Sequence, residues 1–173
     1  MRGEMKKVLV SGLIGSGKSA ACRIIAECGY PVYDCDSRTK ALYTPELKAR
    51  IEEALGVPFS RIGEIFTDKV KRESLQDIVY PLVRDDIKAW LEEQEGPAAF
   101  IESAVAHASE LFKGFFDETL EISAPDDLRA GRNPKALERS KCQSRPENPD
   151  YVIINDGTPE ELRVEVEKYL RTI

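Results

Sequence analysis

The segment 7–19 of the chain reads KVLVSGLIGSGKS. Its first part, VLV at 8–10, is a short apolar run typical of a buried strand, and its second part, GLIGSGKS at 12–19, has the spacing of a phosphate-binding P-loop. Such a loop grips phosphate with backbone N–H groups, and only glycine lets it fold closely enough for successive groups to point inward. The segment therefore predicts a strand that runs into a nucleotide-binding loop.

The end of this loop and the helix expected after it would supply positive charge. Lys18 would place a cation against the β- and γ-phosphates, Ser19 would offer its hydroxyl to Mg²⁺, and the helix would add the positive end of its dipole. A glycine-rich turn that merely joins a strand to a helix is the alternative. Nucleotide binding is favoured because apolar residues follow at helical spacing and Gly29 can end the helix. These residues are Ala21, Ile24, Ile25 and Cys28.

Two carboxylates follow the second predicted strand, YPVYDCD at 30–36. Residues i and i+2 of a strand share a face, so Asp34 and Asp36 would emerge together at its carboxyl end, beside the P-loop. An aspartate there can accept a proton from a substrate hydroxyl or help to order Mg²⁺ and its waters. The pattern leaves open the alternative that Asp36 only caps a helix that begins near Ser37.

The region that follows reads as helical. Apolar spacing predicts helical structure over 37–55, interrupted at Pro45 and closed by Gly56, and then a looser segment over 57–70, with a turn at 66–68. A long helix comes next, which Pro81 should kink because it removes an N–H in mid-helix. Core packing is the default explanation of its apolar stripe, although a kinked helix beside a nucleotide site often shapes an acceptor pocket. The stripe consists of Leu75, Ile78, Val79, Leu82, Ile87, Trp90 and Leu91.

Three further strands are predicted at 98–102, 119–123 and 151–155. Glu102, which ends the first, could position Mg²⁺ through water or simply begin a helix. The last strand is apolar throughout, which predicts burial on both faces, and TPEE at 158–161 predicts a capping box at the start of a terminal helix. Five parallel-type strands that alternate with helices predict a three-layer α/β fold, with a five-stranded parallel sheet and helices on both faces, in a single domain over 1–173.

Composition limits the classes of partner. A net charge of −6 argues against nucleic-acid binding, because a phosphate backbone demands a basic surface. The chain shows no apolar run of membrane-spanning length and no signal peptide in residues 1–7, so we expect a cytoplasmic protein without a membrane partner. His107, the single histidine, is expected to be a surface or packed side chain. The four cysteines lack zinc-ligand spacing and are expected to be reduced thiols: Cys22, Cys28, Cys35 and Cys142.

Positive charge gathers in one stretch of this acidic chain. Six basic residues stand between positions 129 and 145 against a single acid, Glu138. Such a run can be an ordinary solvated helix face, but next to a P-loop it favours a lid over about 126–147 that closes on phosphate. The basic residues are Arg129, Arg132, Lys135, Arg139, Lys141 and Arg145.

Taken together, these motifs resemble the dephospho-coenzyme A kinase family over nearly the whole chain. The matching stretches are GLIGSGKS at 12–19, VYDCD at 32–36, FTD at 66–68 followed by Leu75, ISAP at 122–125 followed by LR at 128–129 and Arg132, and YVIIN at 151–155. The resemblance implies a P-loop kinase that uses ATP and Mg²⁺ to phosphorylate the ribose 3′-hydroxyl of dephospho-coenzyme A. The lid is shorter than the family's by about a dozen residues between Arg132 and Gln143.

The same resemblance implies roles for particular residues. Asp36 would be the general base, and Lys18 and Arg132 would steady the transferred phosphate. Asp34, Asp36 and Tyr80 would contact the acceptor within a site that includes a helical part at about 57–95, and Ser19 would bind the metal. ATP would be held by Gly12, Leu13, Ile14, Gly15, Ser16, Gly17, Lys18, Ser19 and Ala20, with Asn155 near the adenine.

The expected assembly is a monomer or a weak homo-oligomer. Two other readings stay open at this point: a P-loop kinase for another small hydroxyl acceptor, and a nucleotide-binding protein that has lost phosphotransfer.

Overall fold

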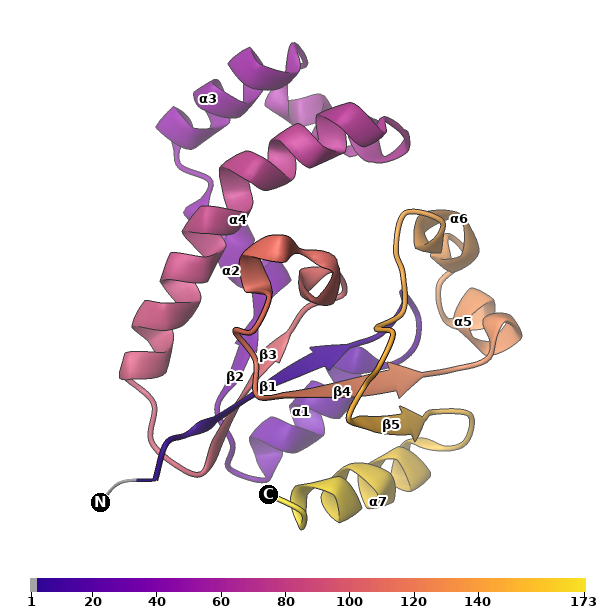
Figure 1. Cartoon of the computed structure of the whole chain (residues 1–173). Coiled ribbons are helices and arrows are strands. Elements are labelled where there is room, and N and C mark those ends of the chain that lie inside the picture. Colours follow the sequence, from indigo (N-terminus) through magenta and orange to yellow (C-terminus); the bar gives the residue numbers. More distant parts are fainter. Residues whose placement is uncertain (1–2) are drawn as a thin grey trace. The chain divides into compact units, whose positions relative to one another are not determined.

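A computed structural model describes residues 3–173 of the chain, apart from the side chain of Phe66 (Figure 1). Residues 1–2 lie outside the described residues. They belong to the segment 1–7, in which we expect no signal peptide. The chain forms two compact units. The first runs through Asp34 and resumes at Glu93–Ile173, and the second is Cys35–Glu92. We call them the sheet unit and the helical unit and describe each by itself.

The sheet unit is built on five strands in the order β2-β3-β1-β4-β5, and all neighbouring strands are parallel. The central strand β1 leads directly into the glycine-rich loop. The predicted five-stranded parallel sheet is therefore confirmed. The strands are β1 (Lys6–Ser11), β2 (Val32–Asp34), β3 (Ala98–Glu102), β4 (Glu118–Ser123) and β5 (Tyr151–Ile154).

Alternation along β1 defines the two faces of this sheet. Val8 and Val10 share a buried core with residues of the helices α1 (Lys18–Glu27) and α7 (Pro159–Leu170), so they face these helices. Leu9 and Ser11 therefore point to the opposite face. On that side the chain between β3 and β4 forms two short 3₁₀ helices, η2 (Ala106–Ala108) and η3 (Glu110–Phe112), and η2 contacts β1 (Figure 1). The arrangement is the predicted three-layer α/β fold.

The strand β5 and the end of α1 differ from their predictions. Since β5 is the edge strand and pairs only with β4, Val152 is 41% and Ile154 is 63% exposed, so the predicted burial on both faces is wrong. An apolar run does not reveal which strand lies at the edge. Similarly, Cys28 follows the last turn of α1 and is exposed, whereas Cys22, which lies within α1, is buried.

The terminal helix α7 follows its prediction closely. The Thr158 side chain accepts from the backbone of Glu161 while the Glu161 carboxylate accepts from the backbone of Thr158, so the capping box is confirmed. Leu162, Val166, Tyr169 and Leu170 are its buried residues. The helix thereby packs, together with α1, against one face of the sheet.

The helical unit consists of α2 (Cys35–Leu42), α3 (Pro45–Leu55), the 3₁₀ helix η1 (Phe59–Thr67) and α4 (Lys69–Glu92). The predicted break at Pro45 is confirmed, because Thr44 caps α3 and Pro45 is its first residue. Gly56 ends α3 in a left-handed conformation, with φ of 67°.

The long helix α4 contains Pro81 and changes direction about midway along its length, which agrees with the predicted kink (Figure 1). Its buried residues are Val79, Val83 and Ile87. Leu82, which was predicted in the buried stripe, is exposed instead. The predicted apolar stripe is therefore wider than the set of residues that α4 buries.

The predicted lid segment contains two short helices, α5 (Asp126–Arg132) and α6 (Ala136–Ser140). Along residues 3–173, no helix is both long enough and apolar enough to cross a lipid bilayer.

Candidate active site

The loop between β1 and α1 depends on glycine at several positions. Gly15 and Gly17 have φ of 80° and 102°, in the region that favours glycine. A side chain at Gly17 would collide with the amide of Asn155, and one at Gly12 would collide with the Ile122 carbonyl. The loop is therefore packed closely against the ends of β4 and β5, as a backbone cradle requires.

The amino end of α1 is prepared for an anion. The helix begins at Lys18 after Gly17, no side chain caps it, and its first turn holds no acidic residue. The first N–H groups of a helix have no carbonyl partner within the helix, so they can donate to an anion, on which the helix dipole also acts. The Lys18 Nζ donates to the Gly12 carbonyl at 2.8 Å, so the ammonium group lies over the loop.

The side-chain hydroxyl of Ser16, in the same loop, is buried without a hydrogen-bond partner in residues 3–173. This residue is 1% exposed, and its Oγ has no hydrogen-bond partner among the described residues. Burying a hydroxyl unpaired is costly, whereas a phosphate oxygen in the loop would satisfy it. The loop therefore fits a nucleotide phosphate chain by its backbone, by its cation and by this hydroxyl.

Carboxylates stand beside the loop at the carboxyl ends of β2 and β3. Asp34 and Glu102 are register partners on these adjacent strands, and Ser19 Oγ donates to Glu102 Oε1 at 3.0 Å. Burial raises the pKa of Glu102 and the charge of Asp34 adds to this, while the Ser19 hydrogen bond lowers it. One hydroxyl and two carboxylates are the oxygen ligands that Mg²⁺ prefers, so Ser19, Asp34 and Glu102 could hold this ion directly or through water.

The sulfur and imidazole groups give no sign of a metal site. Burial raises the pKa of the Cys22 thiol well above its ordinary value, which keeps the thiol neutral. His107 is half-buried and lies between two serine hydroxyls. Over residues 3–173, no three His, Cys, Asp or Glu side chains converge as a metal-binding group.

Arg132 and Asn155 both donate hydrogen bonds to backbone carbonyls of the P-loop. Arg132 donates to the Gly15 carbonyl at 3.1 Å and the Ser16 carbonyl at 3.3 Å, and its other nitrogen donates to the Asn155 carbonyl at 2.9 Å. The Asn155 side chain donates to the Ser16 carbonyl at 2.9 Å. The structure thus brings both predicted residues to the P-loop, while their roles toward phosphate and adenine stay predictions.

Arg129 contacts the P-loop, whereas the sequence placed it only within the basic run and the LR match at 128–129. Its side chain is buried, donates to the Ile14 carbonyl at 3.2 Å and forms an ion pair with Asp126 at 2.6 Å. Gln143 adds a contact from beyond α6, because its Oε1 accepts from the Ile14 N–H at 3.3 Å. The basic run and the LR match at 128–129 were the available signals, and neither identifies this partner, because Ile14 and Arg129 are 115 positions apart.

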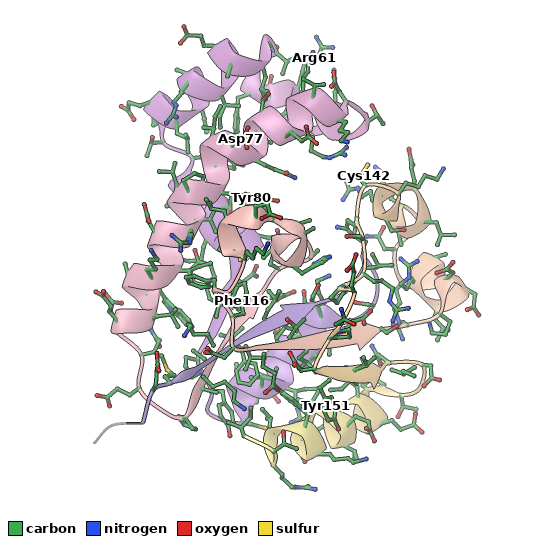
Figure 2. The ribbon with its side chains drawn as sticks, in the orientation of Figure 1. Arg61, Asp77, Tyr80, Phe116, Cys142 and Tyr151 are labelled. Atoms are coloured by element: carbon green, nitrogen blue, oxygen red, sulfur yellow. The ribbon has the colours of Figure 1, made fainter. Side chains whose placement is uncertain are left out.

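Asp36 and Tyr80 belong to the helical unit. Because β2 ends at Asp34 and α2 begins at Cys35, Asp36 lies in the first turn of a helix, and the prediction that it shares a strand face with Asp34 is wrong. Tyr80, labelled in Figure 2, lies on α4. Burial raises the pKa of Tyr80 to about 12, to which nearby Cys35, Tyr43 and Asp36 contribute, so its hydroxyl stays protonated at neutral pH. Asp36 and Tyr80 are therefore neighbours within their unit.

Known proteins resemble this chain in sequence, although no protein-family model matches it. A dephospho-CoA kinase from Porphyromonas gingivalis is 31% identical over 134 residues, which are 71% of this chain and 66% of the relative. The dephospho-CoA kinase from Chlorobaculum tepidum is 29% identical, and the match covers 95% of this chain and 93% of that protein.

Solved structures resemble this chain in fold. The structure of TT1252 from Thermus thermophilus has a TM-score of 0.79 and 26% identity, with 99% of both chains covered. Dephospho-CoA kinase from Campylobacter jejuni has a TM-score of 0.59 and 18% identity, with 98% of both chains covered, and therefore supports the fold alone.

A parallel sheet of this order, with a P-loop at its central strand and carboxylates beside the loop, defines a P-loop kinase. The sequence relatives narrow this class. The chain belongs to the dephospho-coenzyme A kinase family.

Proposed function

We propose that the chain transfers the γ-phosphoryl group of ATP to the ribose 3′-hydroxyl of dephospho-coenzyme A, the last step of coenzyme A synthesis. The observation that carries the proposal is the P-loop itself. An uncapped α1, the Lys18 ammonium and the unpaired buried hydroxyl of Ser16 converge there in a chain whose relatives are dephospho-CoA kinases.

In this proposal the nucleotide lies along the P-loop, residues 12–20. Lys18 neutralises charge on the β- and γ-phosphates, and Arg132 steadies the transferred group from α5. Asn155 lies near the adenine. Ser19 holds Mg²⁺, and the ion screens the phosphate charge when it is bound.

The acceptor hydroxyl needs a base. Asp36 accepts its proton as the 3′-oxygen bonds to the γ-phosphorus, while the bond from that phosphorus to the β–γ bridging oxygen breaks and ADP leaves. Asp34 and Tyr80 contact the acceptor. The helical part at about 57–95 contributes to the acceptor site, and the segment at about 126–147 serves as a short lid.

The test is product formation with purified protein and Mg·ATP. Dephospho-coenzyme A is compared with adenosine, AMP, shikimate, gluconate and no acceptor, and both ADP and coenzyme A are measured. Coenzyme A formed from dephospho-coenzyme A alone supports the proposal. Turnover with a different acceptor would reassign the substrate, and ATP binding without turnover would indicate a nucleotide-binding protein.

We also propose that the protein acts in the cytoplasm as a monomer or a weak homo-oligomer, without a nucleic-acid partner. Four cysteines that form no disulfide in residues 3–173 fit a reducing compartment, and a net charge of −6 disfavours nucleic acid. Light scattering measures the mass in solution, and a stable oligomer would contradict this part.

A further inference from the structure

A pocket of about 430 Å³ opens in the sheet unit, outside the phosphate site. Its walls come from β1, the chain between β3 and β4, the start of β4 and the segment 144–148. This volume falls within the roughly 300–1,000 Å³ of small-molecule sites. We call it the sheet-face pocket.

The apolar part of this pocket rests on the sheet face opposite α1 and α7. Leu9 and Thr119 are register partners on β1 and β4, and both line the pocket. Phe112 is buried and stacks on Phe116, with ring centroids 5.8 Å apart and an interplanar angle of 19°. Phe116, labelled in Figure 2, precedes β4. Two packed aromatic rings give the pocket an apolar lining that is already formed.

The rest of the lining is polar and charged. Lys113 and Arg145 bring two positive charges, and Glu147 brings one negative charge. The guanidinium of Arg145 is held by Glu121, with Nε to Oε1 at 2.6 Å and Nη2 to Oε2 at 3.2 Å. Because Glu121 is 2% exposed and Arg145 is 57% exposed, the buried carboxylate fixes an arginine that still faces solvent. Ser144 and Asn148 add hydrogen-bonding side chains.

One side chain connects the sheet-face pocket to the phosphate site. His107 lines the pocket, and its ring nitrogens lie 3.2 Å from Ser11 Oγ and 3.1 Å from Ser144 Oγ. Ser11 is the last residue of β1 and directly precedes Gly12. The pocket therefore begins next to the strand end from which the P-loop starts.

We propose that the sheet-face pocket binds the pantetheine arm of the acceptor. The inference rests on the proposed function, which makes dephospho-coenzyme A the acceptor. Pantetheine is an uncharged chain with two methyl groups on one carbon, two amides, a hydroxyl and a thiol, so it needs apolar contact and hydrogen bonds together. The aromatic lining supplies the first, and Ser144 and Asn148 supply the second. Lys113 and Arg145 attract the pyrophosphate that joins this arm to the adenosine.

The test fills the pocket without touching the nucleotide site. Ala108 and Asn148 are exposed residues in different walls, so Ala108→Trp and Asn148→Trp narrow the pocket at positions that tolerate a large side chain. Val164→Trp, at an exposed position of α7 on the other side of the sheet, is the matched control. We expect each pocket variant to raise KM for dephospho-coenzyme A about tenfold, equivalent to about 1.4 kcal/mol, with kcat and KM for ATP unchanged. The control keeps the wild-type values.

A second readout uses pantetheine alone. It should compete with dephospho-coenzyme A on the wild type and on Val164→Trp, and compete less on Ala108→Trp. If both pocket variants fold, as circular dichroism and melting curves report, and keep the wild-type KM, the inference is overturned while the proposed function stands.

If instead the wild type makes no coenzyme A, the proposed function fails and calorimetry with pantetheine decides the inference separately. Binding that is lost in Ala108→Trp supports the pocket assignment. Absence of binding to the wild type overturns it.

Discussion

The P-loop and the side chains that support it differ in how they are arranged along the sequence. The loop is eight consecutive residues whose backbone forms the cradle, at positions 12–19. Its support comes from Arg129, Arg132 and Asn155, whose side chains donate to three successive loop carbonyls at Ile14, Gly15 and Ser16. The residues proposed to bind phosphate are therefore consecutive in sequence. The residues that hold the loop in place are more than a hundred positions away.

The same contrast divides the basic run. Arg129 and Arg132 are engaged with the loop, while Lys135, Arg139 and Lys141 are exposed. Arg145 pairs with the buried Glu121, and the other five basic residues of the run are of two kinds. The first kind fixes the phosphate site, and the second is free to meet anions from solvent.

The largest expected effect lies in the loop itself. Lys18→Ala removes the cation from the phosphates, so we expect kcat to fall about 10³-fold while the melting temperature stays near that of the wild type. Steady-state kinetics with dephospho-coenzyme A measures this. Lys168→Ala, at an exposed position of α7, is the control and should retain activity. A Lys18→Ala enzyme with wild-type turnover would show that the loop does not act on the transferred phosphate.

The next effect tests a residue of the helical unit. Asp36→Asn keeps the shape and removes the base, so kcat should fall about 10²-fold with ATP affinity unchanged. Asp77→Asn, an exposed change on α4 labelled in Figure 2, should leave kcat as it is. If Asp36 only favours the start of α2, activity will persist, and the loss will be about 0.3–1 kcal/mol of stability.

Substitution of an arginine that supports the loop should have a smaller effect, mainly on the free energy of unfolding. Arg129→Met removes a buried charged donor from the Ile14 carbonyl, so the free energy of unfolding should fall by about 1.5–3 kcal/mol. KM for ATP should rise with it. Urea denaturation and steady-state kinetics measure the two effects, with Arg139→Met as the exposed control, expected within about 0.5 kcal/mol of the wild type. Equal losses in both variants would erase the distinction between the two kinds of arginine.

The smallest effect concerns the carboxylate beside Ser19. Because the pKa of Glu102 is raised above its ordinary value of 4.5, the native protein holds this proton more tightly than the unfolded chain does. Stability should therefore decrease as pH rises from 4.5 through the raised pKa, and Glu102→Gln should lessen that decrease. Melting temperatures of both proteins across this range provide the check. An unchanged pH dependence in Glu102→Gln would contradict the prediction.

Much of the fold could be read from local patterns. The spacing of 12–19, the break at Pro45 and the capping box at Thr158 each depend on a few neighbouring residues, and the structure has all three. Asp36 was misplaced because the β-rich run YPVYDCD contains no signal for the early end of β2. The exposure of Ile154 was missed because edge position is a property of the whole sheet.

The residues of the candidate site also fall into those that local sequence predicts and those that depend on the folded structure. Residue types and spacing along the chain are sufficient for the glycine loop, its lysine and its serine, since backbone conformation there follows from glycine and short-range sterics. The burial of Arg129, the placement of Asn155 behind Ser16, the pairing of Ser19 with Glu102 and the sheet-face pocket needed the folded chain. Each depends on which distant segments pack together, and that is settled by the free energy of the whole structure rather than by any single stretch of sequence.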